Sequence, residues 1–251
     1  MTVAYDGTHF HGWAKQPGHR TIQGSINEIL SDFTGSEVLV SGASRTDSGA
    51  HALGQVCHFD SSLQIPPDGW RKLINDRAPN DLSIIKAQNV PLNFDSRFCA
   101  VYRHYRYRIL IGPRFPHLAR YAHYLRNSSG FDISKMQKAA SLLVGKHDFY
   151  GFSQETPIET NTVRELYSVH PRKIGHEIWI DIQGTAFVKG MMRRISGALL
   201  EVAMGRRALD SFKRLLAPSV YPDIEWPEVL PANGLTLMEV NYGRKLRDIR
   251  D

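Results

Sequence analysis

Apolar residues recur along the first hundred positions with the spacing of short strands and amphipathic helices. The segment 21–34 places its apolar residues three to four positions apart, which predicts a helix. Thr21 can cap the start of this helix and Gly35 its end. Shorter patterns predict the other elements of this half, which are strands at about 1–5, 37–41, 53–59 and 82–87 and a helix at about 69–77.

The remainder of the chain repeats this order of elements. In the segment 177–182, isoleucines alternate with Trp179 and Asp181, which is typical of a strand with one buried face. The same reasoning predicts strands at about 102–111, 162–170, 177–182 and 235–241, and helices at about 133–144, 187–204 and 210–216.

Both halves therefore follow the order β-α-β-β-α-β, the split βαβ arrangement of ferredoxin-like and RRM-like folds. We predict an α+β protein whose two halves, 1–98 and 99–251, share a central, mostly antiparallel sheet with a cleft between them. The length of 251 residues fits one large domain or two closely joined halves.

The composition is that of an ordinary globular protein, with 42% hydrophobic and 22% charged residues. No apolar run approaches the roughly 20 residues that span a bilayer. We expect no secretory signal, because the first residues already have the pattern of a strand. Cys57 and Cys99 are expected to be free, buried thiols, as in a reducing cytosol, so we predict a cytoplasmic protein.

The net charge of +6 indicates a polyanionic partner, and the distribution of the charge favours RNA. Between Ser96 and Phe131 there is no acidic residue, while arginines alternate with tyrosines. Arginines pair with phosphates and aromatic rings stack on unpaired bases. His104 is expected on the same RNA-facing or solvated surface. The alternative is that the tyrosines fill a core and the arginines form its wet face. The arginines concerned are Arg97, Arg103, Arg106, Arg108, Arg114, Arg120 and Arg126.

The stretch 44–56 is the strongest candidate for chemistry. It places the carboxylate of Asp47 two residues after the guanidinium of Arg45, on a loop that contains glycine. A carboxylate beside a cation can stay ionised where water is scarce, as a nucleophile or general base requires. Taken alone, the pattern is more often a turn with a solvated arginine. His51 lies on the same predicted loop without further ligands, so no metal site is expected.

This stretch resembles the signature of the tRNA pseudouridine synthase A family, in which Arg-Thr-Asp precedes a Gly and a His-Ala pair. Ser44, Ser48 and Ala50 stand where the family usually has Gly, Ala and Val, and none of these positions carries a reacting group. Further segments resemble the family's other motifs in the same order. These are 5–8 with 12–13, 94–98 with 103–107, 187–193 and 234–237.

The resemblance implies isomerisation of uridine to pseudouridine in the anticodon stem-loop of tRNA, at positions 38–40, with Asp47 as the nucleophile. It implies that Tyr105 contacts the target base and that Arg193 pairs with Asp47, while Arg45 is the candidate for holding a phosphate or the opened strand. It also implies a homodimer. Nothing is oxidised and no group is imported, so no cofactor is expected. Candidate RNA contacts are Arg103, Arg114 and Arg120.

Two other functions compete with this one. A non-catalytic RNA-binding protein could have two RRM-like halves, but the aromatic RRM motif is absent and the Arg45–Asp47 segment would have no purpose in it. A glycoside or nucleoside hydrolase needs paired carboxylates, and neither Asp60 nor Asp76 has a diagnostic spacing from Asp47. Whether the carboxylate adds to the base or removes a ribose proton stays open.

Overall fold

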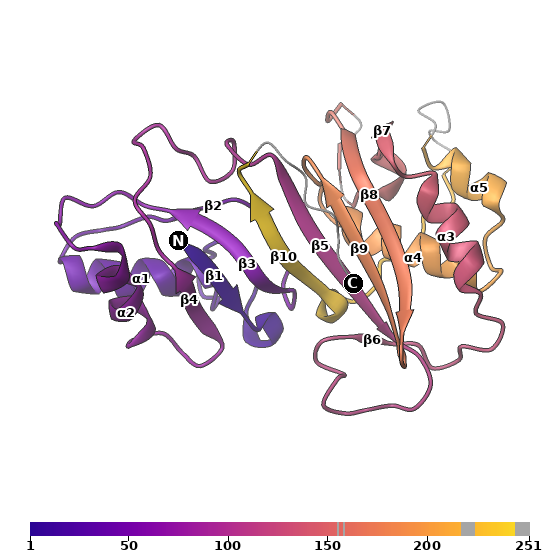
Figure 1. The fold of residues 1–251 in the computed structure, drawn as a ribbon, viewed down its shortest axis with the longest axis horizontal. Coiled ribbons are helices and arrows are strands. Elements are labelled where there is room, and N and C mark those ends of the chain that lie inside the picture. The colour runs from indigo at the N-terminus through magenta and orange to yellow at the C-terminus, as the bar shows by residue number, and fades with distance from the viewer. Residues whose placement is uncertain (155, 158, 217–223, 244–251) are drawn as a thin grey trace. The chain divides into compact units, whose positions relative to one another are not determined.

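The computed structural model describes residues 1–154, 156–157, 159–216 and 224–243 (Figure 1). The chain divides into two compact units. Met1–Val101 and the described residues 236–243 form the first unit, and the described residues between Tyr102 and Leu235 form the second. The last strand of the predicted second half therefore lies almost entirely in the first unit. The predicted boundary between residues 98 and 99 stays a prediction.

The first unit has the predicted β-α-β-β-α-β order of elements. Its sheet has the order β4-β1-β3-β2, in which every neighbouring pair is antiparallel. A further strand, β10 (Leu235–Asn241), pairs in parallel with the start of β3. The elements are β1 (Thr2–Tyr5), a 3-10 turn η1 (Gly7–His9), α1 (Ile22–Thr34), β2 (Ser41–Gly42), β3 (His51–His58), α2 (Pro67–Asn75) and β4 (Leu82–Lys86).

The first helix forms as its sequence predicts. The Thr21 hydroxyl accepts a hydrogen bond from the Gly24 amide at 3.2 Å, and Gly35 ends the helix with a φ of 69°. The apolar stripe of α1 is removed from solvent, with Ile26 and Leu30 fully buried. Since each buried aliphatic side chain contributes about 1.5–3 kcal/mol, this stripe fixes α1 in the core of the first unit.

The second unit follows the predicted order as far as its helices and has two additional short strands, while the last predicted strand, β10, belongs almost entirely to the first unit. Its sheet has the order β5-β9-β8-β7 with antiparallel pairing, and β6 pairs in parallel with β5. Helix α3 packs on β8 and on α4. The elements are β5 (Tyr102–Leu110), β6 (His123–Tyr124), α3 (Ile133–Ser141), β7 (Gly145–Asp148), η2 (Tyr150–Phe152), β8 (Val163–Ile174), β9 (Glu177–Gly184), α4 (Met191–Ala203), α5 (Leu209–Arg214) and η4 (Ala232–Gly234).

Helix α4 begins four residues later than its apolar pattern predicts. Gly190 precedes it with a φ of 71°, in the left-handed region, so the helical backbone cannot extend towards Phe187. The two strands missed by the sequence analysis, β6 and β7, contain only two and four residues. Such segments are too short to show an alternating pattern.

The tyrosines of β5 are part of the core of the second unit. Tyr102 and Tyr107 are fully buried, and Tyr105 is 6% exposed. The Tyr107 hydroxyl donates a hydrogen bond to the carbonyl of Pro231 at 2.6 Å, and burial raises the pKa of this tyrosine. The interpretation of the tyrosines as core residues therefore holds for these three. By the alternation of a strand, Tyr105 and Tyr107 share one face of β5, and His104, Arg106 and Arg108 share the other.

The predicted α+β class and the mostly antiparallel pairing of strands are confirmed. Within the two units, as far as they are described, only the β3–β10 and β5–β6 pairings are parallel. None of the described helices is long and apolar enough to cross a bilayer. The predicted cleft between the halves stays a prediction.

Candidate active site

Asp47 lies in the connection between β2 and β3, on a tight turn. The Ala50 amide donates to the Asp47 carbonyl at 3.1 Å, and Gly49 has a φ of 81°, which favours glycine. Asp47 is half-buried, Arg45 is exposed, and Thr46 between them is buried. The turn therefore holds the carboxylate at the edge of solvent, where a substrate can reach it.

The segment 10–13 supports this turn through its backbone. The Trp13 amide donates to the Thr46 carbonyl at 3.1 Å, and the Gly49 amide donates to the Phe10 carbonyl at 3.3 Å. Gly12 has a φ of 84°, and a Cβ at this position would lie 2.7 Å from the Thr46 carbonyl oxygen. Only glycine fits both the conformation and the space. Both segments carry recognisable motifs in the sequence, but no local pattern indicates that one braces the other.

A buried pair of hydroxyl groups fixes the residue that precedes Asp47. The Tyr5 hydroxyl lies 2.7 Å from Thr46 Oγ1, and both side chains are buried. Because a buried hydroxyl without a partner costs about 1–3 kcal/mol, this contact strongly favours one rotamer of Thr46. The backbone leading into Asp47 is thus held at both its carbonyl and its side chain.

The sequence predicted His51 on the loop, but His51 is the first residue of β3. The pairing of Ala52 with Tyr5 of β1 extends the strand to this position. The His51 side chain is buried, accepts a hydrogen bond from the Gly7 amide at 3.0 Å, and lies 3.2 Å from an Asp6 carboxylate oxygen. Among the residues that the structure describes, no cluster of His, Cys, Asp and Glu could hold a metal ion. His51 instead fastens the start of β3 to the turn η1.

The other two candidates for the reaction lie in the second unit. Tyr105 is in the middle of β5, opposite Ile182, and its ring meets Phe187 edge to face at 5.0 Å between centroids. Arg193 is half-buried in the first turn of α4, where its Nε donates to the Leu230 carbonyl at 2.6 Å. That these two side chains converge with Asp47 stays a prediction.

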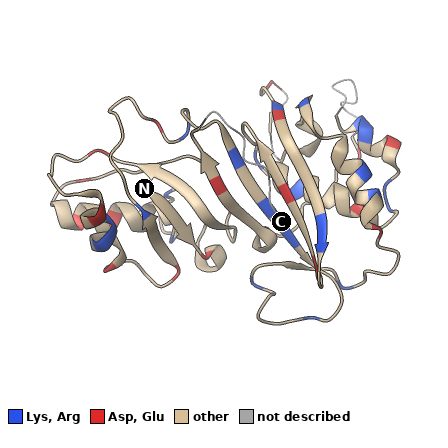
Figure 2. Ribbon diagram, viewed as in Figure 1, with Lys and Arg blue, Asp and Glu red and all other residues tan. Residues whose placement is uncertain are grey.

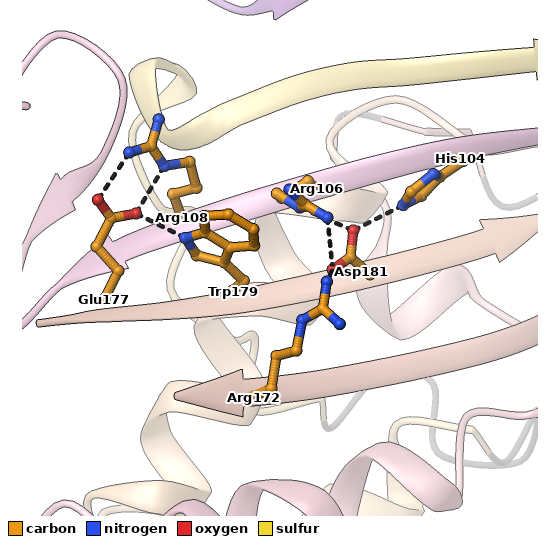
Figure 3. Close-up of polar contacts among 7 residues, drawn as sticks. All are labelled: His104, Arg106, Arg108, Arg172, Glu177, Trp179 and Asp181. Carbon is orange, nitrogen blue, oxygen red and sulfur yellow. Dashed lines mark hydrogen bonds and ion pairs between the residues drawn. The ribbon is translucent and has the colours of Figure 1, made fainter. Parts of the chain in front are cut away.

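The basic face of β5 is built differently from the prediction (Figure 3). His104 and Arg106 both contact Asp181, which is fully buried, at 2.7 and 2.9 Å. Arg108 forms two hydrogen bonds of 2.7 Å with Glu177. No carboxylate lies near these arginines in the sequence, but the fold supplies one for Arg106 and one for Arg108, and His104 is not simply solvated. The partners lie on β9, 75 and 69 residues further along the chain.

Asp181 is the centre of this cluster on the face of the sheet. Burial by itself would raise the pKa of Asp181, but the hydrogen bonds from His104 and Arg106 outweigh it and hold the pKa below its usual range. Arg172 of β8 adds a further contact to Asp181 at 3.3 Å, and the Arg106 guanidinium lies 4.0 Å from the centroid of the Trp179 ring. These groups stabilise one another and join three strands.

The three arginines predicted to bind RNA occupy different surroundings. Arg103 is buried, and its Nη1 donates to the Thr185 carbonyl at 2.7 Å. Arg114 and Arg120 are exposed in the connection between β5 and β6, where Figure 2 shows blue segments. Their contact with RNA stays a prediction, and solvent exposure makes Arg114 and Arg120 the more accessible pair.

The cysteines differ in their exposure. Cys57 is buried, and burial raises its pKa to about 11, so the thiol is neutral and unreactive. Cys99 is exposed, so the prediction of two buried thiols is confirmed for Cys57 and wrong for Cys99. Both are free cysteines.

Comparison with known proteins matches nearly the whole chain. A family model described as tRNA pseudouridine synthase matches residues 1–99 and 139–243. The tRNA pseudouridine synthase A of Brevibacillus brevis is 39% identical over 244 residues, which cover 96% of this chain and 97% of that protein. The protein of the same name from Shouchella clausii is 37% identical over 245 residues, covering 97% and 93%. That from Geobacter sp. strain M21 is 35% identical over 242 residues, covering 96% and 97%.

Proposed function

Because this chain belongs to the tRNA pseudouridine synthase family and is an isomerase acting on uridine in tRNA, we propose that Asp47 is its nucleophile. The proposed targets are the uridines at positions 38–40 of the anticodon stem-loop. The observation that carries the assignment of Asp47 is the tight, braced turn that holds this half-buried carboxylate. The non-catalytic alternative is not favoured, since the relatives matched over 93–97% of their length are named as synthases.

The reaction needs a positioned carboxylate and no imported group. The glycosidic bond between C1′ and N1 of uridine breaks, the uracil turns, and a bond forms between C1′ and C5. The proton on C5 leaves and N1 gains one, so atoms and charge balance. Asp47 can serve either by adding to C6 of the base or by taking a proton from the ribose.

The proposed substrate contacts follow from the state of the target base. A base inside a duplex cannot react, so the target uridine must be flipped out of its stack. Tyr105 is proposed to contact the flipped base and Arg193 to keep Asp47 ionised. The exposed Arg45 suits a contact with phosphate.

The wider context of the enzyme is also proposed. Arg114 and Arg120 are exposed and are proposed to contact tRNA phosphates. We further propose that the protein acts in the cytoplasm, where tRNA is modified, and that it works as a homodimer. Sedimentation of the purified chain with and without tRNA tests the dimer directly.

The deciding experiment maps pseudouridine, base by base, in uridine-containing tRNA transcripts incubated with the protein. The wild type should form pseudouridine in the anticodon arm, and Asp47→Asn should lose at least about 10³ in rate while its fold and tRNA affinity persist. Asp60→Asn is the matched control, because Asp60 is an exposed aspartate that the mechanism does not use. Turnover by Asp47→Asn near that of the wild type would refute the role of Asp47. A wild type that forms no pseudouridine would refute the function.

A further inference from the structure

One motif of the sequence has no role in the proposed reaction. The segment Phe94–Phe98 ends in an aromatic ring that the fold keeps in solvent, with Phe98 81% exposed. The two ends of the motif differ, because the Phe94 ring packs against the rings of His58 and Tyr242 at 6.0 and 5.1 Å between centroids. Phe94 is thus part of the structure, whereas Phe98 has been left outside it.

The residue between these rings anchors the segment firmly. Ser96 is fully buried; its amide donates to His58 Nδ1 at 3.2 Å and its hydroxyl donates to the Ser41 carbonyl at 2.8 Å. The Tyr242 hydroxyl donates to the Ser96 carbonyl at 2.7 Å. Amide, hydroxyl and carbonyl of one residue are all satisfied by three separate parts of the first unit. The backbone on which Phe98 stands is therefore fixed.

The turn that carries Phe98 is closed on itself. The Cys99 amide donates to the Asp95 carbonyl at 3.0 Å, and an Asp95 carboxylate oxygen accepts from the amides of Arg97 and Phe98 at 2.7 and 2.8 Å. The hydrogen bond from the Phe98 amide, together with that from Arg97, holds the pKa of Asp95 below its usual range. Exposure of the ring is consequently a property of an ordered turn.

The ring also has a cation beside it. The Arg97 guanidinium carbon lies 5.6 Å from the centroid of the Phe98 ring, within the range of a cation–π contact. An exposed aromatic ring next to an arginine is the combination with which proteins hold unpaired bases, since the ring stacks on a base and the guanidinium meets the backbone. We propose that Phe98, with Arg97, is a stacking platform for an unpaired base of the tRNA.

This proposal deepens the proposed function and rests on it, because it assumes that tRNA is the substrate. A preorganised ring stacks at little entropic cost, which explains why an ordered turn would hold an apolar side chain in water. The charged side chains of Asp95 and Arg97 flank the ring, whereas the buried core of a protein–protein contact is depleted of charge. An RNA base is therefore favoured over a second copy of the chain as the occupant.

The test compares three changes at Phe98 with one matched control. Phe98→Ala removes the ring, Phe98→Leu keeps apolar bulk without an aromatic face, and Phe98→Tyr keeps the ring. Leu92→Ala is the control, because Leu92 is 99% exposed in the same connection and carries no ring. The dissociation constant is measured with a fluorescently labelled, uridine-containing tRNA transcript and, separately, with a fully paired RNA duplex.

Loss of stacking should raise the dissociation constant for tRNA by about 5- to 150-fold in Phe98→Ala and in Phe98→Leu. The dissociation constants of Phe98→Tyr and Leu92→Ala should stay within about threefold of that of the wild type. Phe98→Tyr keeps the aromatic face, and Leu92 has no aromatic face to lose. Affinity for the fully paired duplex should not change. Melting temperatures should also be unaltered, because the Phe98 side chain is mostly in water.

Three outcomes would overturn the platform. If Phe98→Ala binds tRNA as tightly as the wild type, Phe98 is not a stacking platform. If Phe98→Leu binds tRNA as tightly as the wild type, the contact is apolar and involves no stacking. Dissociation of a dimer by Phe98→Ala, with tRNA affinity of the monomer intact, assigns the ring to a protein contact. Pseudouridine formation by the wild type is measured on the same transcript. If the wild type is active and Phe98→Ala binds normally, the platform fails while the function stands.

Discussion

At the scale of single residues, Thr46 holds the backbone that leads into Asp47. The Thr46 carbonyl accepts a hydrogen bond from the Trp13 amide at 3.1 Å, and the Thr46 hydroxyl lies 2.7 Å from the Tyr5 hydroxyl. Both contacts act on the residue bonded directly to Asp47. A reacting group displaced by about 1 Å can lose about 10²-fold in rate, so the Tyr5–Thr46 contact should matter for the chemistry without touching the substrate.

Removing either hydroxyl should slow the chemical step. We expect Tyr5→Phe and Thr46→Val to lower the single-turnover rate of pseudouridine formation by about 10- to 100-fold while tRNA affinity stays near that of the wild type. Thr46→Ser should recover most of the rate, because it restores the hydroxyl. The double variant should be little worse than either single one, since both remove one shared contact. If Thr46→Val is as active as the wild type, this positioning role is wrong.

The sequence predicts those parts of the site whose signal is local, and it misses contacts between residues far apart in the chain. The Arg45–Asp47 motif and the family resemblance point to Asp47 because their signal lies within a few consecutive residues, and the role of Asp47 stays a prediction. The contact of Tyr5 with Thr46 joins residues 41 apart, and no local pattern announces it. The partners of Arg106 and Arg108 were missed for the same reason, since only the register of β5 with β9 brings the carboxylates across.

The periodic elements were predicted well where they are long. Helix α1, with its cap at Thr21 and its end at Gly35, follows from a regular apolar stripe. The predicted start of α4 was wrong, because Phe187 and Val188 extend the apolar pattern of the helix beyond Gly190, whose left-handed backbone stops the helix. Local patterns thus specify the body of an element better than its ends.

At the scale of elements, Gly12 tests whether the segment 10–13 braces the turn of Asp47. Gly12→Ala should cut the single-turnover rate by at least about 10-fold, since its Cβ would lie 2.7 Å from the Thr46 carbonyl oxygen and displace the turn. Gly18→Ala is the matched control, because Gly18 also has a positive φ, of 72°, but a Cβ there meets nothing within 4 Å. Both variants place alanine at a positive φ, so the difference between their activities reports mainly on the contact with Thr46. Equal activities would contradict the bracing.

The cluster around Asp181 should contribute strongly to the stability of the second unit. Asp181→Asn leaves Arg106 and Arg172 beside a neutral side chain in a buried site, so we expect a loss of about 3–5 kcal/mol in the free energy of unfolding. Asp68→Asn is the control, because Asp68 is 83% exposed in its pair with Arg71 and should cost less than about 1 kcal/mol. Urea denaturation of both variants measures the difference.

The same cluster predicts a dependence on pH. The pKa of Asp181 is lower in the folded than in the unfolded protein, so its ionised form stabilises the fold. This contribution is fully present above the unfolded value of about 3.9 and is lost as pH falls through the lower folded value. The stability difference between wild type and Asp181→Asn should therefore be constant from neutral pH down to about 5 and shrink below about 4. A difference that persists unchanged at low pH would show that packing, not charge, is its source.

At the scale of the whole molecule, the net charge of +6 favours binding to RNA, but fewer arginines are available for it than the sequence suggests. Within the acid-free segment, Arg106 and Arg108 are paired with carboxylates of β9 and Arg103 is buried. Exposed positions such as Arg114 and Arg120 therefore remain as the candidates for phosphate contacts. Phosphate contacts position an RNA and release counterions, but they do not distinguish one base from another.

Reversing these two charges should weaken tRNA binding without changing which uridine reacts. We expect Arg114→Glu/Arg120→Glu to lower affinity at least about 10-fold near 0.1 M salt and to flatten the plot of log affinity against log salt by about one to two units. Lys72→Glu/Lys138→Glu makes the same change in net charge at exposed helical positions and should have a much smaller effect. Mapped pseudouridine positions should be identical in all three proteins, because the missing contacts carry no sequence information. Equal losses in the two double variants would mean that only the overall charge attracts tRNA, and a shifted target uridine would mean that the β5–β6 connection selects the site.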